Sequence, residues 1–202
     1  KVPEDFVFSL KASRFVTNRR VLAEAGESMT KFLTQGLTEL GSHLGPILWQ
    51  FAPTKKFDAD DFGAFLALLP EKQDGIRLRH VVEVRNPTFQ VPEFIDLLAR
   101  HKVAVVCADH HDYPMLPDVT ADFVYCRLQK GEDDIATCYP KAEIGHWAER
   151  VKTYAAGGVP DDLPLIAPDR KAEKTPRDVF AFFITGGKVN APNGAQELQK
   201  AV

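Results

Sequence analysis

Six short apolar segments, most of them separated by helical stretches, constrain the fold of this 202-residue chain more than any other feature of its sequence. They read "FVFSL", "ILWQF", "HVVEV", "VAVVCA", "DFVYC" and "VFAFFI". Near-continuous runs of Val, Ile and Phe are typical of parallel strands that are buried on both faces, because a strand with one solvated face alternates polar and apolar residues. The sequence therefore predicts an α/β fold in which helices cover a parallel sheet.

The stretches between these segments carry apolar residues at helical spacing, with Pro, Gly and Asp at their boundaries. We expect helices at 18–43, 58–69, 91–101, 139–156 and from residue 193 onward, and a long loop over the Pro- and Asp-rich run 157–177. The length fits one domain over residues 1–202, or most of a larger one.

Polar or charged residues stand at or near the end of each predicted strand. They are Lys11, Gln50, Arg85, Asp109, Arg127 and Thr185. Functional side chains at the carboxyl ends of many strands are typical of a (β/α)8 TIM barrel, and no strand is followed by the Gly-x-Gly-x-x-Gly turn of a dinucleotide-binding sheet. The sequence thus predicts a TIM-barrel-like parallel barrel. Since six strands are two fewer than eight, we expect strands 1 and 2 to be absent from this chain, with lost residues or a second chain accounting for the gap.

The segments around these strand ends resemble a known family. "FVFSLKASR", "LGPILWQFAP", "VVEVRNPTF", "DFVYCRLQKG" and "FFITGGKVNAPNGAQEL" resemble, in order and spacing, the domain of unknown function 72 (DUF72, YecE-like) family over essentially the whole chain. The resemblance implies a TIM-barrel-like fold without its first strands and implies no established reaction. This chain has Gln129 within a segment where the family often has a histidine, and Thr185-Gly186 where the family commonly has two asparagines.

Composition and charge argue against several classes of protein. The net charge is −3, so no overall positive field holds nucleic acid without specificity. No apolar run reaches the roughly 18 residues that a membrane-spanning helix needs, and no signal peptide is visible. Cys107, Cys126 and Cys138 lack metal-type spacing, so we expect reduced thiols in a cytoplasmic protein.

The segment "HVVEVR" places Glu83 and Arg85 two residues apart at the end of a strand. Alternate residues of a barrel strand face the same way, so both side chains can point into the lumen. In an enzyme, Glu83 would be the general base, Arg85 and Arg127 would stabilise negative charge, and Lys11 would be a cation or proton donor. An alternative is that these residues form a buried ion-pair network that only stabilises the fold.

Two loops predict a subsite for an anion. The loops after the last two strands of a TIM barrel often bind phosphate through backbone N–H groups. Here they contain Lys130, Gly131, Thr185, Gly186, Gly187 and Lys188. Gln50 is a further candidate ligand-binding residue, with a hydrogen-bonded core amide as the alternative. Solvated lysines in ordinary turns are the alternative for the loops.

Only the Asp109-His110-His111-Asp112 run combines residue types that bind metals. A divalent metal held by Asp109 with His110 or His111 is one interpretation, and a polar loop is the other; the sequence indicates no further cofactor. We therefore expect a hydrolase-like enzyme with a small anionic, phosphate-bearing ligand at the carboxyl face. The alternative is a non-catalytic nucleic-acid-binding module, suggested by the basic cluster Arg14, Arg19 and Arg20.

Overall fold

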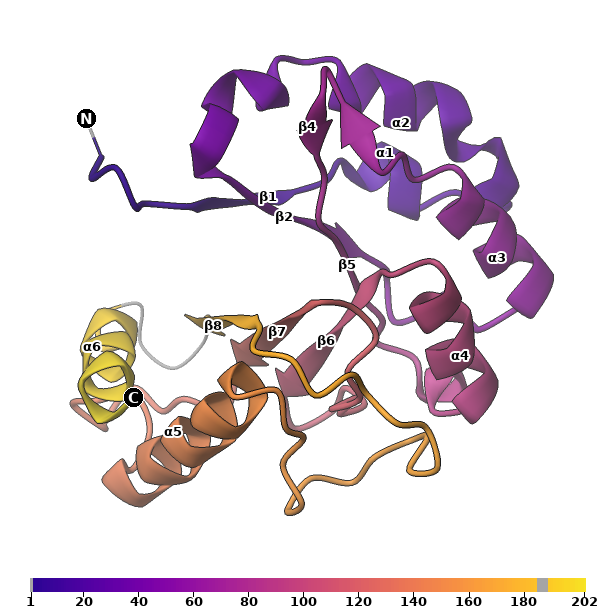
Figure 1. Ribbon diagram of the computed structural model, residues 1–202. Coiled ribbons are helices and arrows are strands. Elements are labelled where there is room, and N and C mark those ends of the chain that lie inside the picture. Colours follow the sequence, from indigo (N-terminus) through magenta and orange to yellow (C-terminus); the bar gives the residue numbers. More distant parts are fainter. Residues whose placement is uncertain (1, 185–188) are drawn as a thin grey trace.

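The computed structural model describes residues 2–184 and 189–202, and its central element is a curled parallel sheet (Figure 1). The sheet has six strands in the order β1-β2-β5-β6-β7-β8. They are β1 (Phe8–Lys11), β2 (Leu44–Gln50), β5 (His80–Glu83), β6 (Ala104–Asp109), β7 (Phe123–Leu128) and β8 (Asp178–Phe183). All five pairings between neighbouring strands are parallel, which confirms the predicted fold class. The described residues form a six-stranded half-barrel and not a closed eight-stranded barrel.

Helices follow most of the strands and lie outside the curl of the sheet (Figure 1). They are α1 (Arg14–Thr17), η1 (Leu22–Ala25), α2 (Gly26–Leu33), η2 (Leu37–His43), α3 (Ala59–Ala67), η3 (Pro87–Phe89), α4 (Pro92–Arg100), α5 (Lys141–Ala155) and α6 (Ala191–Ala201), where η marks a 3₁₀ helix.

The single helix predicted at 18–43 is wrong. This region contains three separate helices, because Gly36 takes a left-handed conformation with φ of 86° and ends the path of α2. A second glycine, Gly41, also has a positive φ within η2. Glycine adopts such angles without the steric cost that other residues meet, so two glycines break a pattern of apolar residues that otherwise suits a continuous helix.

A contact between two hydroxyl groups demonstrates how strongly the sheet curls. The Ser9 Oγ of β1 and the Tyr125 OH of β7 are 3.0 Å apart. Three strands lie between β1 and β7, so in a flat sheet these strands would be about 19 Å apart, at roughly 4.8 Å per spacing. The two side chains meet only because the sheet bends around an inner space, which we call the lumen.

The bend at β1 has a local cause. β2 contains one extra residue between its partners of Phe8 and Leu10, since Phe8 aligns with Leu44 and Leu10 with Ile47. At this bulge a Cβ on Gly45 would lie 2.7 Å from the Phe8 carbonyl oxygen, so only glycine fits. Bulges of this kind increase local twist and bend a strand.

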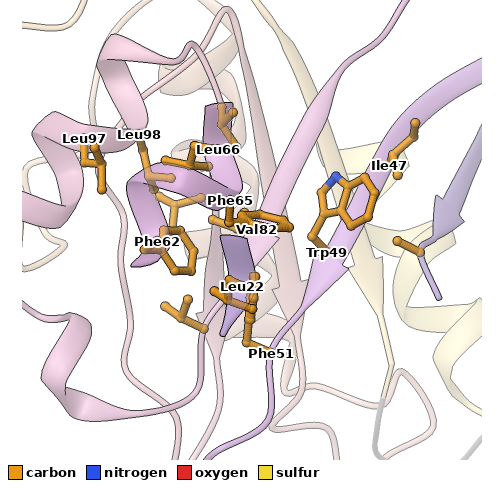
Figure 2. Packing of buried hydrophobic residues seen from close by; sticks show 14 of the residues in the cluster. Leu22, Ile47, Trp49, Phe51, Phe62, Phe65, Leu66, Val82, Leu97 and Leu98 are labelled. Carbon is orange, nitrogen blue, oxygen red and sulfur yellow. The ribbon is translucent and has the colours of Figure 1, made fainter. Parts of the chain in front are cut away.

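The outer face of the sheet packs against helices α2, α3 and α4 through a large apolar cluster (Figure 2). Trp49 and Val82 point outward from β2 and β5, while Phe62 and Phe65 meet them from α3. Each of these four side chains is at most 1% exposed. Trp49 is therefore a core residue.

The lumen is filled by side chains from the strands themselves. One apolar cluster contains Leu48, Val81, Ala104, Val106, Ala108, Phe123 and Tyr125. Below it, the Arg79 guanidinium lies 4.8 Å from the ring centroid of Phe180 and pairs with Asp178 at 2.6 Å. An ion pair therefore lies at the amino ends of the strands, the apolar cluster lies in the middle of the lumen, and a second set of polar groups lies at the carboxyl ends.

Two irregular segments complete the fold. Residues 157–177 form neither helix nor strand, as predicted, and the Arg177 guanidinium donates to the carbonyl oxygens of Gly157 and Gly158 at their base. The short hairpin β3 (Lys72–Gln73) and β4 (Ile76–Arg77) was not predicted, although its Asp74-Gly75 turn is a common hairpin signal.

The three cysteines are buried and have free thiols, which confirms the prediction of reduced core cysteines. None of the helices in the described ranges combines the length and the apolar character that crossing a membrane requires.

We expect the stability of the protein to depend on pH through His80. This buried imidazole accepts from Trp49 Nε1 at Nδ1 and donates from Nε2 to the Pro70 carbonyl oxygen, and burial lowers its pKa. In the unfolded chain the pKa returns to about 6.5, so below that pH only the unfolded state takes up the proton. The free energy of unfolding should then fall by up to about 1.4 kcal/mol per pH unit.

Urea denaturation at pH 7.5 and 5.5 measures this effect. H80Q should be less stable than the wild type at pH 7.5 but should lose less stability between the two pH values. H146Q, which changes an exposed histidine of α5, should keep the wild-type dependence. If the wild type and H80Q lose equal stability between pH 7.5 and 5.5, His80 is not the source of the pH dependence. Any contribution of His110 is the same in all three proteins and cancels in the comparison.

Candidate functional site

A buried carboxylate at the carboxyl end of β5 organises the polar side chains of the lumen. Glu83 is 1% exposed and accepts a hydrogen bond from Gln50 Nε2 at 2.8 Å and one from Arg85 Nε at 2.8 Å. Arg127 Nη1 forms an ion pair and hydrogen bond with the same carboxylate. These four residues, which we call the lumen cluster, join β2, β5 and β7.

The strand registers explain why these residues meet. Gln50 aligns with Glu83 across the β2–β5 pair, so the two side chains leave the sheet side by side. Arg127 lies two residues after Tyr125 on β7 and therefore shares its inward direction. The sequence-based prediction that Glu83, Arg85 and Arg127 point together into the lumen agrees with this geometry.

The lumen cluster carries an unbalanced positive charge. Both guanidiniums form their ion pairs with Glu83, and the described part of the chain places no second carboxylate in ion-pair contact with either of them. One negative and two positive charges leave a net charge of +1 in a place where Arg127 is 8% exposed. Charges removed from water are stable only when they are compensated, so this arrangement favours an anion beside the arginines.

The loop after β6 covers one side of the cluster with two stacked rings. The Arg85 guanidinium lies 4.6 Å from the ring centroid of Tyr113, and the Tyr113 ring stacks on His110 with centroids 3.8 Å apart. Such a contact holds a guanidinium in place without using its hydrogen-bond donors. Arg85 is therefore fixed from two sides, by Glu83 and by Tyr113.

His110 is a neutral imidazole in this setting. Its Nδ1 accepts hydrogen bonds from the backbone N–H groups of Asp112 at 2.9 Å and Tyr113 at 3.3 Å. Burial is the main cause that lowers the pKa of His110, the Asp112 carboxylate opposes it, and Arg85 adds to the lowering. Because Nδ1 accepts, the proton of the neutral ring lies on Nε2, which has no hydrogen-bond partner among the described residues.

Lys11 lies at the rim but outside these contacts. It ends β1, two residues after the inward-facing Ser9, so alternation places it on the lumen side. Its side chain is exposed and forms no ion pair within the described ranges. Lys11 therefore places a positive charge at the entrance of the lumen but forms no ion pair with the lumen cluster.

Asp109 ends a strand as Gln50 does, but the structure does not place it in the lumen with Glu83. Its carboxylate points to the outer face, where it accepts from Tyr139 OH at 3.1 Å and from Trp147 Nε1 at 3.3 Å and pairs with Lys130 Nζ at 2.9 Å. Cys107, two residues before Asp109 on β6, also faces outward and packs in the apolar cluster that contains Tyr139 and Trp147. We call Asp109, Lys130, Tyr139 and Trp147 the outer cluster.

The predicted anion subsite is only partly within the described residues. Lys130 has its ammonium group on Asp109, and its backbone N–H donates to Tyr139 OH at 2.6 Å, so both groups already have partners. Gly131 follows it, half-buried and outside any helix, strand or turn. Thr185, Gly186, Gly187 and Lys188 lie outside the described residues, and their predicted roles stay predictions.

The metal interpretation finds no support in the geometry. No group of three or more His, Cys, Asp or Glu side chains in residues 2–184 and 189–202 is arranged to hold a metal ion. Asp109 faces the outer cluster, His110 faces the lumen cluster, and His111 is exposed. Asp109, His110 and His111 are adjacent in the sequence, but their side chains do not converge on one point.

Sequence reasoning missed three members of the lumen. Tyr113 lies in a loop whose path the strand pattern does not fix, and Ser9 and Tyr125 sit in apolar runs where a hydroxyl group attracts little attention. Inward alternation from Arg127 would have identified Tyr125, because the two are separated by two positions on one strand.

Comparison with known proteins identifies relatives of the chain. The family model described as "Protein of unknown function DUF72" matches residues 1–202. A crystal structure of a DUF72 family protein from Thermotoga maritima has a TM-score of 0.66 at 19% identity, with 98% of this chain and 73% of that chain covered. Two crystal structures of a DUF72 family protein from Enterococcus faecalis have TM-scores of 0.66 and 0.67 at 19% identity, covering 98% of this chain and 79% and 75% of theirs. At this identity the likeness concerns the fold, and no curated protein matches the chain.

We expect E83Q to lower the free energy of unfolding by about 3–5 kcal/mol, since breaking a buried ion pair from one side leaves unpaired charges behind. The amide keeps the size of the side chain but leaves two guanidiniums without a negative partner. E93Q, which removes an exposed carboxylate from the first turn of α4, is the matched control and should change stability by less than about 0.5 kcal/mol. Urea denaturation at pH 7.5 measures both; a loss below 1 kcal/mol for E83Q would contradict a buried, charge-bearing cluster.

Proposed function

This chain belongs to the DUF72 family of proteins of unknown function, and we propose that it binds a small anion, such as the phosphate group of an ester, at the lumen cluster. The observation that carries the proposal is the excess of one positive charge in a cluster whose Glu83 and Arg127 are buried and whose Arg85 is half-buried. Arg85 and Arg127 share one carboxylate, so together they can compensate an additional negative charge.

The chemistry of the donors also suits an oxyanion. A guanidinium offers five N–H donors in a planar fork, and Glu83 accepts from one nitrogen of each arginine, Nε of Arg85 and Nη1 of Arg127. Arg127 Nε is buried and has no hydrogen-bond partner among the described residues. Spare donors on two fixed guanidiniums are what recognition of a phosphate or carboxylate group requires.

Glu83 fits the role of a positioning residue better than that of a general base. Both of its oxygens already accept hydrogen bonds from cationic or amide donors of the protein, so the carboxylate holds neighbouring side chains in place. A buried ion-pair network that stabilises the fold and an anion-binding site would therefore use the same contacts. The ion pairs with Glu83 stabilise the lumen and also hold the two arginines that would bind the anion.

A hydrolytic step would use His110. Its neutral ring carries a proton on Nε2, and its neighbours Tyr113 and Arg85 place it beside the lumen cluster. Water attacks the phosphorus and forms the new P–O bond while the P–O bond to the leaving group breaks, with the protons exchanged with solvent. A fixed N–H donor can stabilise the negative charge that develops on the leaving oxygen. Lys11 at the entrance would add a second cation for a ligand with more than one negative charge.

Calorimetric titration with inorganic phosphate and with sulfate at constant ionic strength tests the binding proposal. R127Q and R85Q should each weaken binding at least about tenfold, which corresponds to the loss of one charge-assisted contact. R77Q removes an exposed arginine that pairs with Asp122 and should bind like the wild type. Equal affinities in the wild type and both lumen variants, each shown to be folded by circular dichroism, would contradict the proposal.

A panel of phosphate monoesters tests the hydrolytic step separately. H110N should lower phosphate release at least about 100-fold, as the loss of a single charge-stabilising donor does, while phosphate binding stays within twofold. H111N, at the exposed neighbouring position, should match the wild type. Unchanged release by H110N, or no release by the wild type from any ester, would contradict hydrolysis and leave the binding result standing on its own.

A further inference from the structure

A second site lies on the loops that follow β1 and β2, where two grooves adjoin. One groove of 840 Å³ is lined by residues of the loop after β1 and of α2, including Arg14, Phe15 and Lys31. The other groove, of 750 Å³, lies between the same loop and the loop after β2 and includes Arg20 and Lys56. Asn18 and Arg19 line both grooves, so the two form one continuous surface, which we call the basic groove. Its lining includes residues of α1 and α2, which Figure 1 labels.

The basic groove concentrates positive charge in a chain whose net charge is −3. Its cationic residues are Arg14, Arg19, Arg20, Lys31, Lys55 and Lys56. Arg14, Arg20, Lys31 and Lys56 are exposed and form no ion pair in the part of the chain that the structure describes.

The carboxylates of the groove do not cancel this charge. Asp58 caps α3 by accepting from the Asp61 backbone N–H at 2.9 Å. Asp61 accepts from the Leu22 N–H at 2.6 Å and pairs with Lys55 Nζ at 2.7 Å. Glu27, in the first turn of α2, is the remaining acidic residue in the lining, so four exposed cations face one uncommitted carboxylate.

An exposed aromatic ring accompanies these cations. Phe15 is 72% exposed, and its backbone N–H is fixed by Ser13 Oγ at 3.3 Å. A single exposed apolar residue is ordinary on a protein surface, so the position of Phe15 among cations, and not its exposure, is what gives it a role here. A ring beside arginines and lysines offers a base a face to stack on while its phosphates meet the cations.

The arrangement distinguishes among anionic ligands. The exposed cations are spread along both grooves and do not converge on one point, which suits a chain of phosphates better than a single phosphate group. The bases of a duplex are already stacked on one another, whereas those of a single strand have open faces for Phe15.

We propose that the basic groove binds single-stranded nucleic acid, with Phe15 stacking on a base and Arg14, Arg20, Lys31 and Lys56 contacting phosphates. This site is separate from the lumen cluster and does not rest on the anion proposed there. Binding of this kind depends strongly on salt, because phosphate contacts release counterions.

Fluorescence anisotropy with labelled twelve-nucleotide oligo(dT) and oligo(U), in low and in moderate salt, tests the proposal. R14E/K31E should weaken binding at least about tenfold and flatten the salt dependence. F15A should weaken it at least about fivefold, the effect of losing one stacked base. R100E/K102E makes the same charge change on exposed residues at and just after the end of α4 and should leave binding within twofold.

Two further arms separate the outcomes. R127Q, which changes the lumen cluster, should bind the oligonucleotides like the wild type, and a DNA duplex of the same length should bind at least about tenfold more weakly. Wild-type affinity in R14E/K31E, or no binding by the wild type in low salt, would overturn the site. Equal affinity for the duplex would overturn its single-strand preference.

Discussion

The carboxylate of Glu83 is the interaction on which the polar half of the lumen depends. It accepts from Gln50 on β2, from Arg85 just beyond its own strand and from Arg127 on β7. The contact with Arg127 reaches across β6, which lies between β5 and β7, so it is favoured by the same curvature that brings Ser9 to Tyr125. Curvature and charge therefore support each other, since the bend gathers the charged groups and the ion pairs hold the bend.

The two faces of the sheet divide the chemistry of the strand ends. The lumen cluster has more cations than carboxylates, while the outer cluster pairs Asp109 with Lys130 and adds the donors of Tyr139 and Trp147. The outer cluster is balanced and fixes the turn after β7 to α5. Of these two clusters, the lumen cluster is the one that keeps an uncompensated charge, which is why the anion proposal rests on it and not on the loops.

Much of the fold follows from local patterns, and the errors have identifiable causes. The apolar runs located all six strands, and alternation from Glu83 to Arg85 identified the lumen residues. The position of Asp109 at a strand end does not show which face of the sheet its side chain takes. Alternate residues of β6 face the same way, so Asp109 faces outward with Cys107, while Ala108 faces the lumen. The break at Gly36 depends on a left-handed backbone angle that helical spacing does not reveal. The stacking of Tyr113 on His110 and Arg85 depends on the path of a loop, which tertiary contacts determine.

The most direct test of the uncompensated charge is a crystal structure of the protein in the presence of selenate, whose anomalous scattering identifies it. The account predicts a selenate ion within hydrogen-bonding distance of both Arg85 and Arg127, with the Glu83 contacts unchanged. A lumen in which the two arginines contact only Glu83 at saturating selenate, or in which another carboxylate neutralises them, would contradict it.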